Sequence, residues 1–172
     1  MKTITLITGG QRSGKSSFAE RMALSLSDNP VYIATSRIWD EEYHKRIKRH
    51  QADRGDEWEN IEEEKTLSKH DVTGRVVLVD CVTLWTTNYF FDSNGDVPGT
   101  LEAIKQEFDA FTEQDAHFIF VTNEIGLGGT PENELQRKFT DLLGWINQYI
   151  GKQADEVYFT VSGIPMKIKD HK

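Results

Sequence analysis

The chain has 172 residues, a formal net charge of −8 and 37% hydrophobic residues. This length and composition predict one folded domain over residues 1–172 and exclude a disordered chain, which would carry fewer apolar residues. The acidic balance argues against general nucleic-acid binding, because displacing counterions from a nucleic acid needs a broad cationic face.

Two further classes of protein are excluded by short features of the sequence. Cys81 is the only cysteine, so the chain can form neither an intrachain disulfide nor a zinc site built of several thiolates. The apolar run at 4–8 is too short for a signal-peptide core or a membrane span. We therefore expect a cytoplasmic protein without a membrane span.

Short apolar runs rich in β-branched residues alternate with helical stretches along the chain. The runs predict strands at 4–8, 31–35, 76–80, 117–122 and 157–163. The stretches between them predict helices at about 16–27, 40–52, 84–91, 99–114 and 131–151. Such alternation is typical of a three-layer α/β fold with a mostly parallel central sheet.

The remaining segments are interpreted as connections and helix ends. The acidic residues 56–65 are predicted to form a solvated face or a connection, and residues 90–99 a polar loop. The last helix is predicted to start at Pro131, with Thr130 as its N-cap and Glu132 complementing the helix dipole.

The first predicted strand leads directly into GGQRSGKSS, which matches the phosphate-loop pattern G-x-x-x-x-G-K-S. Glycines in this pattern let backbone amides turn inward around phosphates, and the helix that follows adds positive potential. Lys15, expected to be exposed, neutralises phosphate charge, and the Ser16 hydroxyl is a ligand for Mg²⁺. The residues assigned to this phosphate site are Gly9, Gly10, Gln11, Arg12, Ser13, Gly14, Lys15 and Ser16.

Asp80 ends the third apolar run, VVLVD, and is predicted to hold Mg²⁺ through water. An aspartate at the end of a strand is common, but the phosphate loop upstream favours the metal role here. These motifs predict a P-loop NTPase-like fold that binds a nucleoside triphosphate and Mg²⁺. They do not identify the acceptor.

The segment YHKRIKRHQADR is strongly basic in an otherwise acidic chain. If it is helical, Trp39, Tyr43 and Ile47 recur at four-residue spacing and form a buried stripe, with Arg46 and His50 beside it. The cations around His50 are Lys45, Lys48, Arg49 and Arg54. Nearby positive charge keeps a histidine neutral, as a nucleophile must be, but spacing alone favours a solubilising helix over catalysis.

Six segments occur in one order from the first strand to the C-terminus: GGQRSGKS, YIATS, RIKRHQADRGDEW, LVDCVTLWTTN, VTNEIGLGGTPEN and VSGIPMKIK. Together they resemble the bifunctional adenosylcobinamide kinase/adenosylcobinamide-phosphate guanylyltransferase family of cobalamin biosynthesis. The resemblance covers essentially the whole chain. One departure is that the family usually has Arg-Pro where this chain has Arg54-Gly55 ahead of Trp58, so the turn after His50 is looser.

The resemblance implies roles for particular residues. The family's histidine that accepts GMP covalently falls on His50, and its strand-end aspartate on Asp80. Its phosphate-loop lysine and serine fall on Lys15 and Ser16. Arg49 and Arg54 belong to the cations that gather the triphosphate.

Glu124 follows a predicted strand at the carboxyl edge, where ligands of α/β sheets gather. It is assigned to binding the nucleotide or orienting the acceptor, with a capping or surface carboxylate as the alternative.

The resemblance implies two reactions. In the first, ATP or GTP gives its γ-phosphoryl group to a hydroxyl of adenosylcobinamide. In the second, a His50 nitrogen attacks the α-phosphorus of GTP, pyrophosphate leaves, and adenosylcobinamide phosphate collects GMP to give adenosylcobinamide-GDP. The resemblance also implies a homo-oligomer, and a trimer is the form that we expect.

Two other functions stay open at this stage. One is a kinase-only P-loop enzyme, whose basic helix binds the phosphate of the acceptor. The other is a nucleotide-dependent switch protein, although the sequence has no Asn-Lys-x-Asp stretch for guanine recognition.

Overall fold

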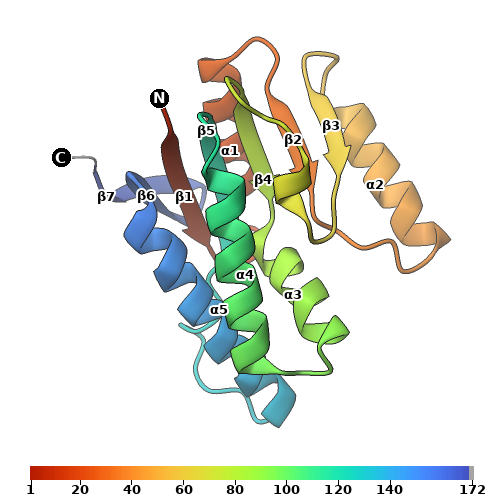
Figure 1. Cartoon of the computed structure of the whole chain (residues 1–172), viewed down its shortest axis with the longest axis vertical. Coiled ribbons are helices and arrows are strands. Elements are labelled where there is room, and N and C mark those ends of the chain that lie inside the picture. The colour runs from red at the N-terminus through yellow and green to blue at the C-terminus, as the bar shows by residue number, and fades with distance from the viewer. Residues whose placement is uncertain (171–172) are drawn as a thin grey trace.

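The computed structural model describes residues 1–170, which form a seven-stranded sheet in the order β3-β2-β4-β5-β1-β6-β7 (Figure 1). The first six strands of this order pair in parallel, and β7 pairs antiparallel with β6. The strands are β1 (Thr3–Gly9), β2 (Val31–Ala34), β3 (Glu59–Glu62), β4 (Val76–Asp80), β5 (His117–Asn123), β6 (Glu156–Val161) and β7 (Ile164–Lys169).

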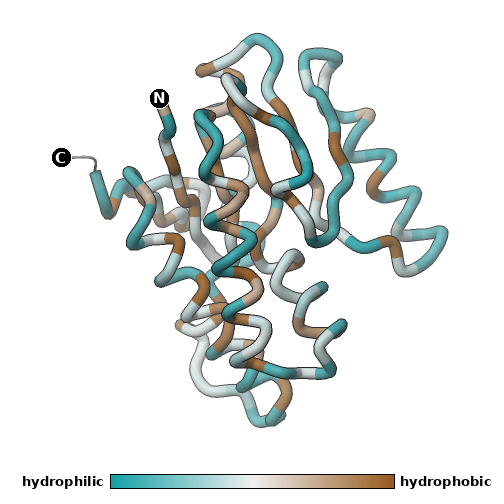
Figure 2. The backbone as a smooth tube through the Cα atoms, viewed as in Figure 1, coloured by the Kyte–Doolittle hydropathy of each residue, from teal (hydrophilic) through white to brown (hydrophobic). Residues whose placement is uncertain are grey.

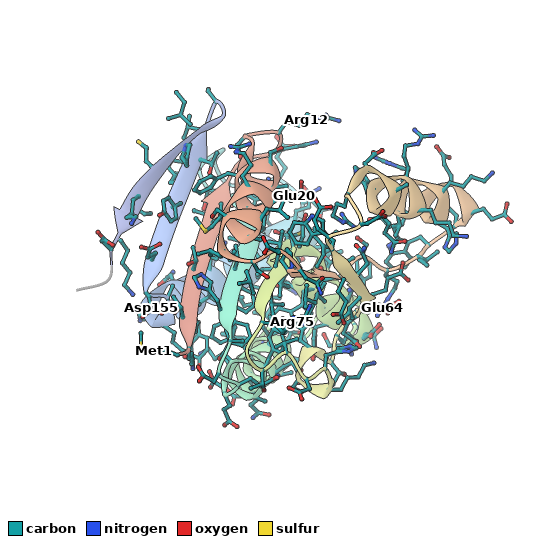
Figure 3. All side chains as sticks on the ribbon, turned by 90° about the horizontal axis from the view of Figure 1, so that it is seen from above. Met1, Arg12, Glu20, Glu64, Arg75 and Asp155 are labelled. Atoms are coloured by element: carbon teal, nitrogen blue, oxygen red, sulfur yellow. The ribbon has the colours of Figure 1, made fainter. Side chains whose placement is uncertain are left out.

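The helices lie on both faces of the sheet. They are α1 (Lys15–Leu26), α2 (Glu41–Asp53), α3 (Val82–Asp92), α4 (Val97–Thr112) and α5 (Glu134–Gln153), with a short 3-10 helix, η1 (Leu67–Lys69). α1 covers one face, α3, α4 and α5 cover the other, and α2 lies beyond the β3 edge (Figures 1 and 3). The predicted three-layer α/β fold with a mostly parallel sheet is therefore confirmed.

The apolar strands fill two cores because the pleat sends successive side chains to opposite faces. On β4, Val77 and Val79 join the cluster under α3, α4 and α5, whereas Leu78 joins the smaller cluster under α1. In Figure 2, the hydrophobic stretches of the tube gather on the central strands, and the hydrophilic ones lie mostly on the outer helices and loops. Burial on both faces explains why these strands read as continuous apolar runs.

Two strands were not predicted. β3 lies within the acidic segment that was interpreted as a connection, and among its residues only Ile61 is even partly buried. The strand predicted over 157–163 ends at Val161, and a turn leads into β7. Both missed strands lie at the edges of the sheet, where one row of backbone groups is unpaired and the apolar signal is weak.

Several helix boundaries differ from the prediction. α5 begins at Glu134, and the side chain of Asn133 caps it by accepting a hydrogen bond from the Gln136 amide. The predicted start at Thr130 and Pro131 is wrong because Asn133, three residues further on, takes the N-cap position. The predicted loop at 90–99 is also shorter, since α3 runs to Asp92 and α4 starts at Val97.

The predicted buried stripe of α2 is wrong. Trp39 is 60% exposed, and none of the residues that the structure describes in α2 is buried. The helix nevertheless has a good N-cap, because the Asp40 side chain accepts a hydrogen bond from the Tyr43 amide. α2 therefore adds little to the core and presents its basic residues to solvent.

No helix formed by residues 1–170 is both long enough and apolar enough to cross a bilayer.

A buried carboxylate closes the turn that follows β3. Glu63 accepts hydrogen bonds from the backbone amides of Lys65 and Thr66 at 3.0 and 2.9 Å and contacts the side chains of Lys69 and His70. Burial opposes ionisation, but these hydrogen bonds outweigh it and lower the pKa of Glu63 to about 2.

We predict that Glu63→Gln makes the free energy of unfolding depend less on pH in the acid range. Because the pKa of Glu63 is lowered in the folded state, its contribution is complete above about pH 4.5 and is lost as the pH falls towards about 2. Urea unfolding at a series of pH values measures the effect, with the exposed Glu113→Gln as the control. If the free energy of unfolding fell with decreasing pH equally in both variants and the parent, Glu63 would not have this role.

Candidate functional site

The phosphate loop joins β1 to α1 and is closed by its own lysine. Gly14, in the left-handed region at φ 91°, is the N-cap of α1. The Lys15 ammonium donates a hydrogen bond to the Gly10 carbonyl at 3.0 Å. Lys15 is only 9% exposed, so the expectation of an exposed lysine is wrong. Burial lowers the pKa of Lys15, against the opposing influence of Cys81 and Asp80.

The turn between β6 and β7 supports the phosphate loop from behind. The Gly163 amide donates a hydrogen bond to the Ser13 carbonyl at 2.8 Å. A Cβ atom added to Gly14 would lie 3.0 Å from Gly163 Cα, and one added to Gly9 would lie 2.7 Å from the Thr160 carbonyl oxygen. Sequence analysis did not assign Gly163 to the site, although the Ser-Gly pair in VSGIP signals a tight turn.

Asp80 ends β4 beside the loop and is held by a tyrosine. The Tyr32 hydroxyl donates a hydrogen bond of 2.6 Å to Asp80 Oδ2. Burial, followed by the Asp80 charge, raises the pKa of Tyr32 well above its usual value, so the phenol keeps its proton. The Arg54 guanidinium lies over the Tyr32 ring at 3.5 Å from its centroid, and Trp58 packs edge-on against that ring at 5.8 Å.

A cavity of about 510 Å³ separates α1 from α2, a volume suited to a small-molecule ligand. Polar and charged residues from both helices and from the strand ends line it: Ser16, Ser17, Glu20, Tyr32, Arg46, His50, Asp53, Arg54 and Asp80. Figure 3 shows Glu20 on the side of α1 that faces α2. Burial raises the pKa of Glu20, and Arg54 opposes that shift.

The structure brings together four of the residues assigned from sequence. Ser16, His50, Arg54 and Asp80 line the same cavity, although they come from different segments of the chain. Arg12, at φ 53°, lies exposed on the outside of the loop, as Gln11 does.

The other assigned residues do not line this cavity: residues 9–15 of the phosphate loop, Arg49 and Glu124. Arg49 is exposed on α2, and Arg46 lines the cavity instead. Glu124 Oε1 accepts hydrogen bonds from the amides of Gly126 and Leu127 at 2.6 and 2.9 Å, so it caps the loop that follows β5. This geometry matches the alternative interpretation of Glu124.

Sequence analysis also missed residues of the cavity, among them Tyr32 and Glu20. Tyr32 lies in an apolar run, so it was interpreted as core. Glu20 lies four residues after Ser16 on α1, and this one-turn spacing is the signal that places both on one face of the helix.

Comparison with known proteins gives a consistent result. The family described as "Cobinamide kinase / cobinamide phosphate guanyltransferase" matches residues 5–168. The "Bifunctional adenosylcobalamin biosynthesis protein CobP" of Pseudomonas aeruginosa is 41% identical over 169 residues, covering 95% of this chain and 96% of the relative. The CobU proteins of the same description from Escherichia coli and Salmonella typhimurium are 38% and 39% identical, each covering 95% of this chain and 98% of the relative.

Solved structures of other proteins match more weakly. The P4 protein from bacteriophage phi6 in complex with ADP matches 96% of this chain and 54% of its own, with a TM-score of 0.49 and 15% identity. The flagellar accessory protein FlaH from Methanocaldococcus jannaschii matches 98% of this chain and 79% of its own, with a TM-score of 0.48 and 14% identity. Likeness at this level has no bearing on function.

We predict opposite outcomes for alanine at the first two glycines of the loop. Gly9→Ala pushes a Cβ atom against the Thr160 carbonyl, which costs about 1–3 kcal/mol of folding free energy and displaces the loop. Gly10→Ala meets no atom within 4 Å, so it should leave the unfolding temperature unchanged and is the matched control for stability. Thermal unfolding compares the two variants, and nucleotide titration checks Gly9→Ala. A Gly9→Ala protein that unfolds and binds nucleotide as the parent does would rule out this packing.

Proposed function

The chain belongs to the cobinamide kinase/cobinamide phosphate guanylyltransferase family, and we propose that it performs both reactions of that family at the cavity between α1 and α2. The substrates are adenosylcobinamide, its phosphate, and ATP or GTP. The observation that supports one shared site is that Ser16 of the phosphate loop and His50 of the basic helix line the same cavity.

In the kinase reaction, the phosphate loop binds the triphosphate and the acceptor hydroxyl attacks the γ-phosphorus. The bond from the γ-phosphorus to the bridging oxygen breaks, and the nucleoside diphosphate leaves. In this proposal, the loop amides and the Lys15 ammonium stabilise the negative charge that develops on the transferring group. Lys15 is already held by the Gly10 carbonyl, so little reorganisation is needed.

In the guanylyltransferase reaction, a neutral His50 ring nitrogen attacks the α-phosphorus of GTP and pyrophosphate leaves. A phosphate oxygen of adenosylcobinamide phosphate then attacks the same phosphorus, which releases His50 and gives adenosylcobinamide-GDP. Arg46 and Arg54 lie in the same cavity and supply positive charge for the phosphates.

The site also fits Mg²⁺. The described residues contain no group of three His, Cys, Asp or Glu side chains that could hold a metal. Mg²⁺ needs no such group, because it binds through one or two protein oxygens and completes its shell with phosphate oxygens and water. We assign the Ser16 hydroxyl to it as a direct ligand and the Asp80 carboxylate as a group that holds it through water. When bound, it neutralises charge on the triphosphate.

The proposal also includes one domain over residues 1–172, a cytoplasmic location and a homo-oligomer, a trimer by the family resemblance. Exposed apolar side chains on the β6–β7 hairpin support association: Val161, Ile164, Met166 and Ile168.

We predict that Lys15→Ala lowers kcat of the kinase reaction by about a hundredfold or more, because its charge stabilises the transferring group in the transition state. Steady-state assays with adenosylcobinamide measure this, and circular dichroism checks the fold, since Lys15 is buried. The exposed Lys138→Ala is the control. Normal turnover by Lys15→Ala would remove the phosphate loop from the proposed kinase site.

We predict that His50→Ala loses guanylyl transfer by about a thousandfold or more yet keeps kinase activity, because only the second reaction needs a protein nucleophile. Incubation with α-labelled GTP should label His50 with GMP through an acid-labile, alkali-stable bond, found by mass spectrometry of peptides. His44→Ala, on the same helix but outside the cavity lining, is the matched control. A chain that forms adenosylcobinamide-GDP without labelled histidine would favour direct transfer.

A further inference from the structure

We infer that Tyr32 is a positioning residue that links the carboxylate beside the phosphate loop to the helix that carries His50. The inference rests on the proposed function, because it assigns to Tyr32 an effect on Asp80 through its hydroxyl and an effect on His50 through its ring. Tyr32 itself is 7% exposed and lies on β2, between the two parts of the site.

The hydroxyl side of Tyr32 fixes Asp80. The 2.6 Å hydrogen bond to Oδ2 has the short length of a bond to a charged acceptor. It occupies Oδ2 and restricts the rotation of the group, so we assign Oδ1 to the contact with hydrated Mg²⁺. A phenol in this position orients the carboxylate that holds Mg²⁺ through water, as outer partners do at metal sites.

The ring side of Tyr32 fixes the end of α2. The Arg54 guanidinium lies 3.5 Å from the ring centroid, and the Arg54 amide donates a hydrogen bond to the His50 carbonyl at 3.3 Å. Arg54 Nε also donates to Asn60 Oδ1 at 3.1 Å. Trp58 packs against the Tyr32 ring from the edge, so the ring is a rigid platform for Arg54.

This platform matters because α2 has few other anchors. None of the described side chains of α2 is buried, so packing into the core does not set the position of the helix. Its C-terminal half is held by the Arg54 contacts and by the hydrogen bond from Gln51 to Glu62 at 2.9 Å. The place of His50 relative to the phosphate loop therefore depends on Arg54, and Arg54 depends on the Tyr32 ring.

The two sides of Tyr32 can be separated by substitution. Tyr32→Phe keeps the ring under Arg54 but removes the hydrogen bond to Asp80. Tyr32→Leu removes both. Tyr149→Phe is the matched control, because the Tyr149 hydroxyl donates to the Asp109 carboxylate at 2.7 Å on the exposed surface of α4 and α5, away from the cavity.

The first measurement is calorimetric binding of α,β-methylene-GTP across a Mg²⁺ titration. We expect Tyr32→Phe to raise the Mg²⁺ concentration needed for tight binding by about tenfold or more, as loss of an outer partner does at other metal sites. Tyr149→Phe should match the parent. Asp80→Asn is measured beside them. If Asp80→Asn raises the Mg²⁺ concentration needed for tight binding and Tyr32→Phe does not, the hydroxyl half of the inference is overturned. If neither variant raises it, the metal role of Asp80 itself fails.

The second measurement follows GMP transfer to His50 in a single turnover at saturating Mg²⁺. We expect Tyr32→Phe to label His50 at a rate near that of the parent, and Tyr32→Leu to be about tenfold slower or more, without an equal fall in nucleotide affinity. Equal rates for the two variants would overturn the ring half. If the parent protein itself did not label the peptide that contains His50, the proposed function would be contradicted instead.

The third measurement needs no nucleotide. Hydrogen exchange of the amides at 50–54 reports the end of α2, and we expect faster exchange in Tyr32→Leu but not in Tyr32→Phe. If Tyr32→Leu does not fold, Arg54→Gln tests the same contact from the other side and should also speed exchange at these amides. Unchanged exchange in Arg54→Gln would overturn the link between Tyr32 and α2.

Discussion

The parallel register of β1, β2, β4 and β5 is the constraint on which the site depends. Ala34 of β2 pairs with Asp80 of β4, and Gly9 of β1 pairs with Asn123 of β5. The carboxyl ends of these strands therefore meet at one edge of the sheet, where the phosphate loop begins and where Asp80 ends β4. A slip of one residue would turn the strand-end side chains to the other face.

Around this edge, the site combines a rigid half with a weakly held half. The phosphate loop is packed against Thr160 and Gly163, so its shape is fixed before any nucleotide binds. α2 has no such support and depends on contacts at its C-terminal end. Tyr32 contacts both halves, because its hydroxyl binds Asp80 and its ring carries Arg54.

The sequence-based predictions were accurate for features that neighbouring residues decide and wrong for features that depend on contacts with distant segments. The three-layer fold was predictable because buried parallel strands leave continuous apolar runs, and the phosphate loop because strand, glycines and helix are adjacent in the chain. β3 and β7 were missed because edge strands depend on backbone pairing with a neighbour. The start of α5 was misplaced because Asn133 and Thr130 are both good N-caps, and the local sequence does not rank them.

By itself, the sequence determined the fold class, the phosphate loop and, through its resemblance to a family, the two reactions, because these depend on local order and on motifs along the chain. The same resemblance supplied His50 as the proposed nucleophile. Only the tertiary structure decided that α2 lies outside the core, that Glu124 caps its own loop, and that Arg46 rather than Arg49 lines the cavity. It also decided that Tyr32 lies between Asp80 and Arg54, residues 48 and 22 positions away in sequence. Contacts of this kind arise from the packing of strands and helices in space, which no spacing along the chain encodes.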